Sequence, residues 1–170
     1  MSVNDLVVNP LSASSFGAFG DVIELSGEPS AIINSGNCAR YNDLAELSFI
    51  EGGQCGISLF QAKPYKLPHT LDLLERHPLG SQAFIPMHRE PFLVIVAPDQ
   101  QGVPGQPVAF ATSGRQAVNY HRNTWHGVLT PVGNDGLFAV VDRIGGLGSN
   151  LQENVLDTPW RIVDSSQLLT

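Results

Sequence analysis

The run Phe92-Leu93-Val94-Ile95-Val96-Ala97 decides the fold class of this chain. All six residues are apolar, and Phe, Val and Ile are residues that favour β-strands. Apolar residues do not alternate with polar ones here, as they would in a strand with one wet face. The run therefore predicts a central strand of a β-sheet that is covered on both sides.

Further short β-type runs lie on both sides of this strand and are separated by turn residues. The chain has 17 Gly and 12 Pro, spread along its whole length, so turn signals recur at strand-length intervals. Strands at such spacing predict an all-β sandwich or barrel. The predicted strands are Leu6–Val8, Asp21–Leu25, Ala31–Ile33, Gly56–Gln61, Ala83–Pro86, Val108–Ala111, Val128–Thr130, Leu137–Asp142 and Arg161–Val163.

Helix signals are few. Ser12–Phe19 reads as one short helix, with Ser12 or Ser14 as the N-cap and Gly20 as the stop, and a second short helix or turn is expected around Ser165–Leu169. The segment 99–107 is rich in Gln, Gly and Pro and is expected to be a loop. No composition shift marks a boundary, so residues 1–170 are expected to form a single domain.

The composition excludes several classes of function. A net charge of −7 with no Lys/Arg cluster argues against nucleic acid and against a membrane surface as partners. No apolar run approaches the ~20 residues of a membrane-spanning helix, and no basic segment of a secretory signal precedes Asp5. Cys38 and Cys55 stand alone, as reduced thiols do. We expect a soluble, cytoplasmic protein, and its low charged content of 15% suggests that much of its surface is hidden in sheet pairing or in an oligomer interface.

One segment concentrates groups that can bind a metal or move protons. Leu71, Leu73, Glu75 and His77 share one strand parity, so the leucines predict that Glu75 and His77 point inward. A carboxylate buried alone costs several kcal/mol, so an inward Glu75 needs a partner, a metal or a proton. The alternative is a solvated Glu75 beside a His77 that merely caps a turn, and a lone Glu-x-His favours it.

Three more polar residues reduce the weight of that alternative. Gln82 follows the turn at Pro78–Ser81 and is predicted to face the same interior from a paired strand. His126 opens a predicted strand, and His121 lies in a predicted turn. Each histidine alone could be structural, His126 through a backbone hydrogen bond and His121 as a turn residue. Together with Glu75 and His77 they predict a site.

Other polar residues are interpreted as structural. Asp142 and Arg143 read as a local ion pair at a sheet edge, with a supporting role for Asp142 as a weaker alternative. His88 is expected to be solvated in a hairpin turn. Residues 145–148, Gly-Gly-Leu-Gly, lack the Lys-Ser/Thr of a phosphate-binding loop and are expected to be a flexible turn.

The site pattern resembles the two-motif layout of the cupins. Glu75-x-His77 followed by Gln82, and then a distant Trp125-His126 opening a strand, is similar to the family's His-x-His with a downstream Glu and a later His. The chain departs from that pattern, because Glu75 stands at the first histidine position and Gln82 at the glutamate. The resemblance implies an all-β, cupin-like double-stranded β-helix, or jelly-roll barrel, with one or two short helices. It also implies Glu75, His77, Gln82 and His126 as candidate metal ligands.

Longer motifs resemble a narrower family, the ureidoglycolate lyases. That resemblance implies a homodimer and cleavage of (S)-ureidoglycolate to glyoxylate and urea in allantoin (purine) catabolism. It also implies nickel or another divalent metal, with no organic cofactor expected. The motifs are Glu75–Met87, Val118–His126, Pro10–Ile23, Arg40–Ala45, and Asp142-Arg143 with Gly145-Gly146.

The implied reaction is an elimination that needs a base and an acid. His77 or Glu75 could take the hydroxyl proton, and His121 or His126 could protonate the departing nitrogen. A metal could instead chelate the substrate's carboxylate and hydroxyl. Substrate-binding candidates are Gln82, Tyr120, Arg122 and Arg89, the arginines as partners of the substrate carboxylate. The alternatives are a metal-dependent cupin oxygenase or isomerase, and a non-catalytic cupin that binds a small carboxylate.

Overall fold

The protein is almost entirely β-structure. A computed structural model describes residues 4–164. Its elements are β1 (Asn4–Pro10), α1 (Ala13–Phe16), β2 (Gly20–Ile23), β3 (Ala31–Ile33), β4 (Cys38–Arg40), β5 (Gln54–Gln61), β6 (His69–Arg76), β7 (Gln82–Pro86), β8 (Phe92–Ala97), β9 (Asp99–Gln100), β10 (Val103–Pro104), β11 (Val108–Ala111), β12 (Ala117–Tyr120), β13 (Trp125–His126), β14 (Thr130–Pro131), β15 (Leu137–Ile144) and β16 (Gln152–Val163).

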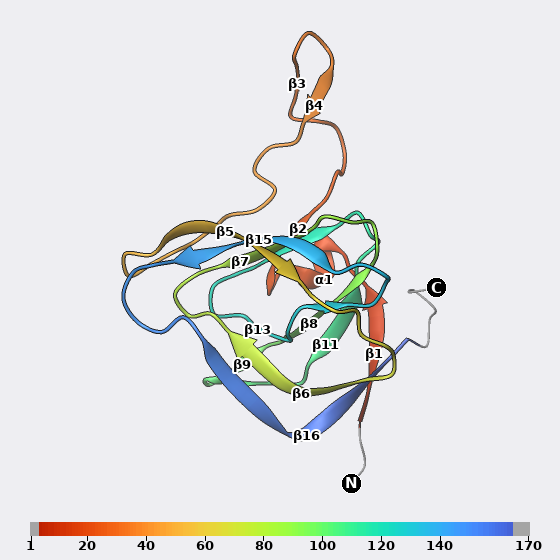
Figure 1. Ribbon diagram of the computed structural model, residues 1–170, viewed down its shortest axis with the longest axis vertical. Coiled ribbons are helices and arrows are strands. Elements are labelled where there is room, and N and C mark those ends of the chain that lie inside the picture. Colours follow the sequence, from red (N-terminus) through yellow and green to blue (C-terminus); the bar gives the residue numbers. More distant parts are fainter. Residues whose placement is uncertain (1–3, 165–170) are drawn as a thin grey trace.

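The largest sheet closes into a barrel. Its strand order is β11-β1-β16-β6-β13-β8-β14, and a further pairing between β11 and β8 joins the ring (Figure 1). Strand β1 is parallel to both of its neighbours, whereas the other pairs in the ring are antiparallel. A second sheet, in the order β2-β12-β7-β15-β5, lies against this barrel. This is the predicted all-β architecture, a cupin-like β-barrel.

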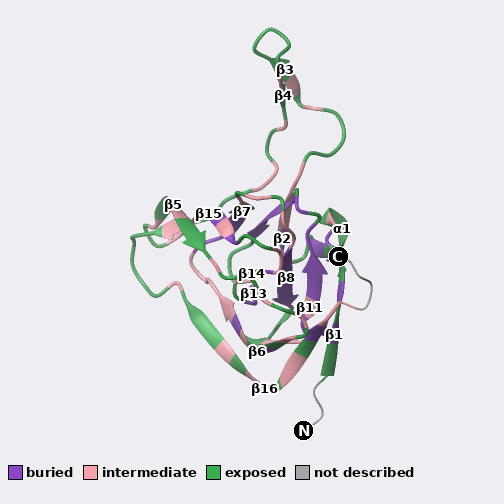
Figure 2. Ribbon diagram, turned by 45° about the vertical axis from the view of Figure 1, so that its right-hand side comes forward, coloured by how far each residue is buried: buried purple, intermediate pink, exposed green. Residues whose placement is uncertain are grey.

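Strand β8 supplies both hydrophobic cores. Leu93 and Ile95 belong to the core inside the closed ring, while Val94 and Val96 belong to the core shared with the five-stranded sheet. Every residue of β8 is at most 2% exposed, and the strand is buried throughout in Figure 2. The prediction of a central strand covered on both sides is therefore confirmed, with the bounds that the sequence indicated.

The predicted first helix is present but short. Ser12 is the N-cap, and its Oγ accepts a hydrogen bond from the backbone N–H of Ser15 at 3.2 Å. The helix ends at Phe16, before the predicted end at Phe19, and Phe16 anchors it by burying its ring between Phe110 and Tyr120. The predicted helix at 165–169 lies outside the described residues.

Two peripheral predictions need correction. The strand expected at Val128–Thr130 is confined to Thr130–Pro131, and Val128 is exposed. The loop expected at 99–107 contains a small hairpin, β9–β10.

Within residues 4–164, none of the helical structure has the length and apolar character needed to cross a membrane.

A two-stranded arm stands away from the body of the molecule. Strands β3 and β4 pair only with each other and project beyond the five-stranded sheet (Figure 1). Ile32 and Ile33, in β3, are exposed. An isolated hairpin is at best marginally stable in water, and within the described residues neither strand of the arm pairs with another strand.

The connection between β6 and β7 passes from one sheet to the other. Strand β6 pairs with β13 and β16 in the barrel, whereas β7 pairs with β12 and β15 in the second sheet. The prediction that Gln82 lies on a strand paired with β6 is therefore wrong. The turn at 78–81 instead places Gln82 across the inter-sheet space from Glu75, where both residues line one pocket.

Candidate active site

Polar residues from the two sheets face one another across a pocket. In the barrel, Glu75 of β6 lies directly opposite His126 of β13. In the second sheet, Tyr120 of β12 pairs with Gln82 of β7. Asp142 of β15 continues the register beside Gln82, and its Oδ2 lies 3.5 Å from Gln82 Nε2. Five residues distant in sequence thus form two adjacent polar rows where the sheets meet.

An irregularity in strand pairing precedes Glu75 on β6. The pairing of β6 with β16 shifts register between Leu71 and Leu73. Leu71 and Leu74, which differ in parity, both face the core inside the barrel. The prediction that Leu71, Leu73 and Glu75 all point to one face of β6 is therefore wrong. Glu75 is inward as expected, but it faces the pocket between the sheets instead of the leucine core of the barrel.

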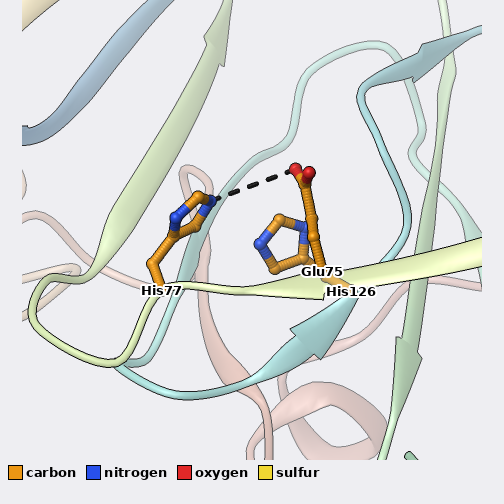
Figure 3. Close-up of side chains that lie close together, drawn as sticks. All are labelled: Glu75, His77 and His126. Atoms are coloured by element: carbon orange, nitrogen blue, oxygen red, sulfur yellow. Dashed lines mark ion pairs between the residues drawn. The ribbon is translucent and has the colours of Figure 1, made fainter. Parts of the chain in front are cut away.

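Glu75, His77 and His126 form a compact cluster (Figure 3). One ligand atom from each lies within 4.8 Å of the other two, and Nε2 of His77 lies 4.0 Å from Oε1 of Glu75. The two imidazole centroids are 5.2 Å apart. The structure therefore brings together three of the four predicted metal ligands, and the fourth, Gln82, lines the same pocket.

Backbone carbonyls determine which ring nitrogen of each histidine carries the proton. Nδ1 of His77 lies 2.6 Å from the carbonyl oxygen of Asn150, and Nδ1 of His126 lies 2.9 Å from that of Gly127. A carbonyl only accepts hydrogen bonds, so both Nδ1 atoms donate, and in the neutral ring Nε2 keeps its lone pair. Both Nε2 atoms are buried and lack a protein partner. Ring nitrogens oriented in this way are typical of metal-binding histidines.

The surroundings shift the pKa values of the cluster. Burial raises the pKa of Glu75; His77 opposes the shift, and the nearby charge of Glu153 adds to it. Burial, with a smaller effect from His77, lowers the pKa of His126 to about 3, so its imidazole is neutral at pH 7. Tyr120 stacks on His126 with ring centroids 4.4 Å apart and 5° between the planes. Burial also raises the pKa of the Tyr120 phenol, which keeps it neutral.

The pocket beside the cluster has a volume of about 610 Å³. Its walls are partly apolar, with Phe84 and Leu129 among the contributors, and its polar groups include Glu75 and Asp142. None of its lining residues, all within the described range, is a lysine or an arginine. The pocket thus holds two carboxyl groups and neither a lysine nor an arginine.

These features fit a bound divalent cation. The lone pairs of His77 and His126 and a carboxylate oxygen of Glu75 are nitrogen and oxygen ligands that Ni²⁺, Zn²⁺ or Fe²⁺ accepts. Oε1 of Gln82 is also buried without a protein partner. Three protein ligands leave positions open for a substrate, as in catalytic metal sites.

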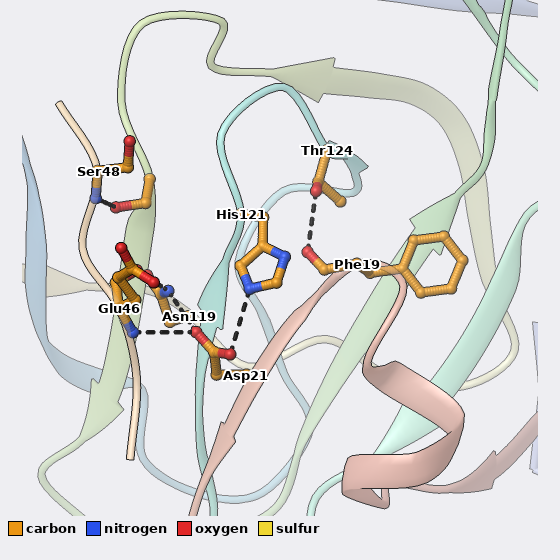
Figure 4. A network of polar contacts seen from close by, with 8 residues as sticks. Phe19, Asp21, Glu46, Ser48, Asn119, His121 and Thr124 are labelled. Carbon is orange, nitrogen blue, oxygen red and sulfur yellow. Dashed lines mark hydrogen bonds and ion pairs between the residues drawn. The ribbon is translucent and has the colours of Figure 1, made fainter. Parts of the chain in front are cut away.

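The remaining predicted residues lie elsewhere. Nε2 of His121 lies 3.2 Å from Oδ1 of Asp21, in a network with Asn119 (Figure 4), and His121 does not line the pocket. Arg122 is exposed in the turn before β13. Arg89 lines another pocket, of about 690 Å³. Tyr120 does not line the 610 Å³ pocket either, but it contacts the site by stacking on His126.

Asp142 lines the pocket, although the sequence mainly predicted a structural ion pair for it. The predicted ion pair with Arg143 is wrong, since Arg143 donates to the carbonyls of Ile50, Glu51 and Leu147. Strand β15 is also an internal strand, paired with β5 and β7. Alternation along the strand could have indicated this, because Phe138 and Val140, which share the parity of Asp142, face the inter-sheet core.

Two local contacts of histidine side chains were not predicted from the sequence. His88, predicted to be solvated, packs its ring against Phe138 with centroids 4.9 Å apart, and its Nε2 is buried. The backbone carbonyl of Asn150 orients His77, a contact for which the sequence carries no signal.

Comparison with known proteins identifies the family. A sequence profile for "Ureidoglycolate lyase" matches residues 3–163. The chain is 55% identical to the ureidoglycolate lyase of Rhodobacter capsulatus over 91% of this chain and 95% of that protein. It is 49% identical to ureidoglycolate lyase 2 of Rhizobium meliloti, over 92% and 96% of the two chains. The chain belongs to the ureidoglycolate lyase family.

Proposed function

We propose that this protein is a lyase that cleaves (S)-ureidoglycolate to glyoxylate and urea in allantoin (purine) catabolism. In this elimination the hydroxyl loses its proton and becomes the aldehyde carbonyl of glyoxylate. The carbon–nitrogen bond breaks, and the departing nitrogen takes up a proton to give urea. No water is consumed. The names of relatives that align over almost their full length support this reaction.

The observation that carries the proposal is the cluster of Glu75, His77 and His126, of which Glu75 and His77 line the pocket. The substrate is a small anion that presents a hydroxyl and a nitrogen on one carbon. A cleaving site therefore needs a cation for the carboxylate and a group that transfers a proton between neighbouring atoms. The pocket supplies the proton-transfer group directly, through Glu75, but its lining residues include no lysine or arginine for the carboxylate.

A divalent metal held by the cluster would supply the missing positive charge. Glu75, His77 and His126 are the residues that would hold it, and Gln82 is a fourth candidate through Oε1. When bound, a metal such as Ni²⁺ acts as a Lewis acid that draws electron density from the oxygens it contacts. The two carboxyl groups of the pocket would otherwise repel an anionic substrate.

Glu75 is our candidate for the proton transfer. Its carboxyl group lines the pocket, and a carboxylate has two oxygens, one of which can take a proton and return it. The hydroxyl oxygen and the leaving nitrogen are bonded to the same carbon, so one carboxylate can reach both. Glu75 could then remove the hydroxyl proton and deliver a proton to the nitrogen, without a separate acid.

The histidines take other roles in this proposal. His126 is neutral, and with its proton on Nδ1 the inward Nε2 can only accept, so we favour a ligand role over that of an acid. His77 has the same tautomer. Protonation by His121, and carboxylate binding by Arg122 or Arg89, remain predictions, and none of the three lines this pocket.

The test is an assay of the purified protein with (S)-ureidoglycolate, with and without added Ni²⁺. We expect glyoxylate and urea in equal amounts, and a large loss of turnover in Glu75→Gln. His69→Gln is the matched control, because His69 lies on the same strand but its ring contacts Tyr65 and does not line the pocket. Binding without release of glyoxylate would indicate the non-catalytic alternative. Oxygen consumption or isomerised product would indicate a cupin oxygenase or isomerase.

We further propose that the protein acts as a homodimer through the outer face of the five-stranded sheet. Ile57 and Leu59 of β5 are 77% and 67% exposed, and Ile85 of β7 extends the same face, since both Leu59 and Ile85 pair with Ala139 of β15. A second copy would bury this apolar face and could support the arm formed by β3 and β4.

The free thiols of Cys38 and Cys55 fit a cytoplasmic location.

A further inference from the structure

We propose that Asp142 binds the ureido group of the substrate and is the residue that selects ureido acids over other small carboxylates. This inference rests on the proposed cleavage of ureidoglycolate. Asp142 lines the pocket on the five-stranded sheet, whereas Glu75 and His77 line it from the barrel side. The pocket therefore has one carboxyl group in the cluster and another on the opposite sheet.

The geometry around Asp142 leaves its carboxylate able to accept hydrogen bonds from a ligand. Within the described residues its side chain has one long hydrogen bond, from Nε2 of Gln82 to Oδ2 at 3.5 Å. Gly56 pairs with Asp142 on the other side and is buried, and a side chain there would collide with Ile144. The arginine that follows Asp142 in the chain is bound to backbone carbonyls, so it does not neutralise the carboxylate.

The substrate carries the complementary donors. A ureido group presents its N–H and one N–H of its terminal NH₂ in parallel, which matches the two oxygens of a carboxylate as a guanidinium does. Its carboxylate end is repelled by Asp142 and attracted to a cation held by the cluster. Charge therefore directs the ureido end of the substrate toward Asp142 and its carboxylate end toward the cluster. The carbinol carbon lies between the two ends, beside Glu75.

Binding of two stable probes tests the inference without relying on turnover. Oxalurate keeps the ureido group and the carboxylate, whereas glycolate keeps the carboxylate and hydroxyl but has no ureido group. We expect Asp142→Asn to weaken oxalurate binding to the Ni²⁺-loaded protein by about tenfold or more, since a charge-assisted pair of hydrogen bonds is lost. Glycolate binding should change less than about twofold, because its contacts lie on the cluster side.

A second Asp→Asn substitution, outside the pocket, serves as the control. Asp157→Asn removes the same charge from an exposed residue of β16 and should leave both affinities unchanged. Equal losses for oxalurate and glycolate in Asp142→Asn, or no loss for either, would overturn the role of Asp142. Circular dichroism and metal content verify that each variant is folded and loaded. Failure of the wild-type protein to release glyoxylate from ureidoglycolate would instead refute the proposed reaction.

Discussion

The backbone carbonyl of Asn150 lies 2.6 Å from Nδ1 of His77 and so directs the lone pair of Nε2 away from it, toward Glu75. Asn150 is itself held, because its Oδ1 accepts the backbone N–H of Leu79 at 2.8 Å. The residue thus joins the segment after β15 to the turn after β6. Contacts of this kind orient metal ligands and strengthen their binding.

Asn150→Ala should therefore weaken metal binding although Asn150 is not a ligand. Loss of the bond to Leu79 frees the carbonyl that orients His77, and we expect about a tenfold loss of Ni²⁺ affinity by calorimetry. Asn150→Asp keeps an oxygen acceptor for the same N–H and should bind Ni²⁺ more tightly than the alanine variant. Equal affinities in all three proteins would show that the contact does not orient the ligand.

Removal of any one cluster residue should lower metal content. In Glu75→Gln, His77→Ala and His126→Ala, one nitrogen or oxygen ligand is lost or weakened, and we expect each to retain less than about a tenth of the wild-type Ni²⁺ after dialysis. Elemental analysis by mass spectrometry measures this directly. His69→Ala, on the same strand as Glu75, should retain the wild-type content. Wild-type loading in all three variants would contradict the metal site.

His126 should make the metal-free protein sensitive to mild acid. Its folded pKa of about 3 lies below the ordinary value of 6.5, so between these values the unfolded chain binds a proton that the folded one does not. Stability is present above pH 6.5 and falls as the pH is lowered toward 3, by about 1.4 kcal/mol per unit.

Urea unfolding in a chelator at pH 7 and pH 5 measures this effect. Glu75 acts in the opposite sense, since a raised carboxyl pKa favours the folded state as the pH falls, so the comparison is made in a Glu75→Gln background. His126→Phe should remove about 2 kcal/mol of the stability lost between the two pH values. An unchanged loss would mean that His126 is not the titrating group.

The barrel core should be intolerant of truncation. Leu93 is 2% exposed in β8, so Leu93→Ala should lower the free energy of unfolding by about 2–5 kcal/mol. Leu25 is 77% exposed, and Leu25→Ala should change it by less than about 0.5 kcal/mol. Similar effects for the two variants in urea unfolding would contradict the placement of β8.

Charge on the outer sheet face should disrupt the dimer. Leu59→Asp places a carboxylate in the proposed apolar interface, and we expect a shift from dimer to monomer in light scattering. Val103→Asp, which charges an exposed valine in the small β9–β10 hairpin, should leave the mass unchanged. A dimeric Leu59→Asp protein would place the interface elsewhere.

The central strand, the first helix and most of the other strands of this protein follow from residues that are near neighbours in the sequence. The run Phe92–Ala97 is apolar on both faces, and a strand of that kind can exist only between two cores. The Ser12 cap and the β-type runs between turn residues likewise depend on near neighbours. The Glu75-x-His77 spacing and His126, taken with the family resemblance, predicted a cluster that the described residues form.

Only the tertiary structure decided how these groups face one another. Along β6, Leu71 and Leu74 both face the leucine core while Glu75 faces the inter-sheet pocket, a change of parity that counting alternate residues cannot detect. The turn after His77 crosses between sheets, and so Gln82 and Asp142 came to oppose the cluster while His121 paired with Asp21. Pairing between strands far apart in the chain depends on the packing of the whole barrel, and local sequence carries little information about it.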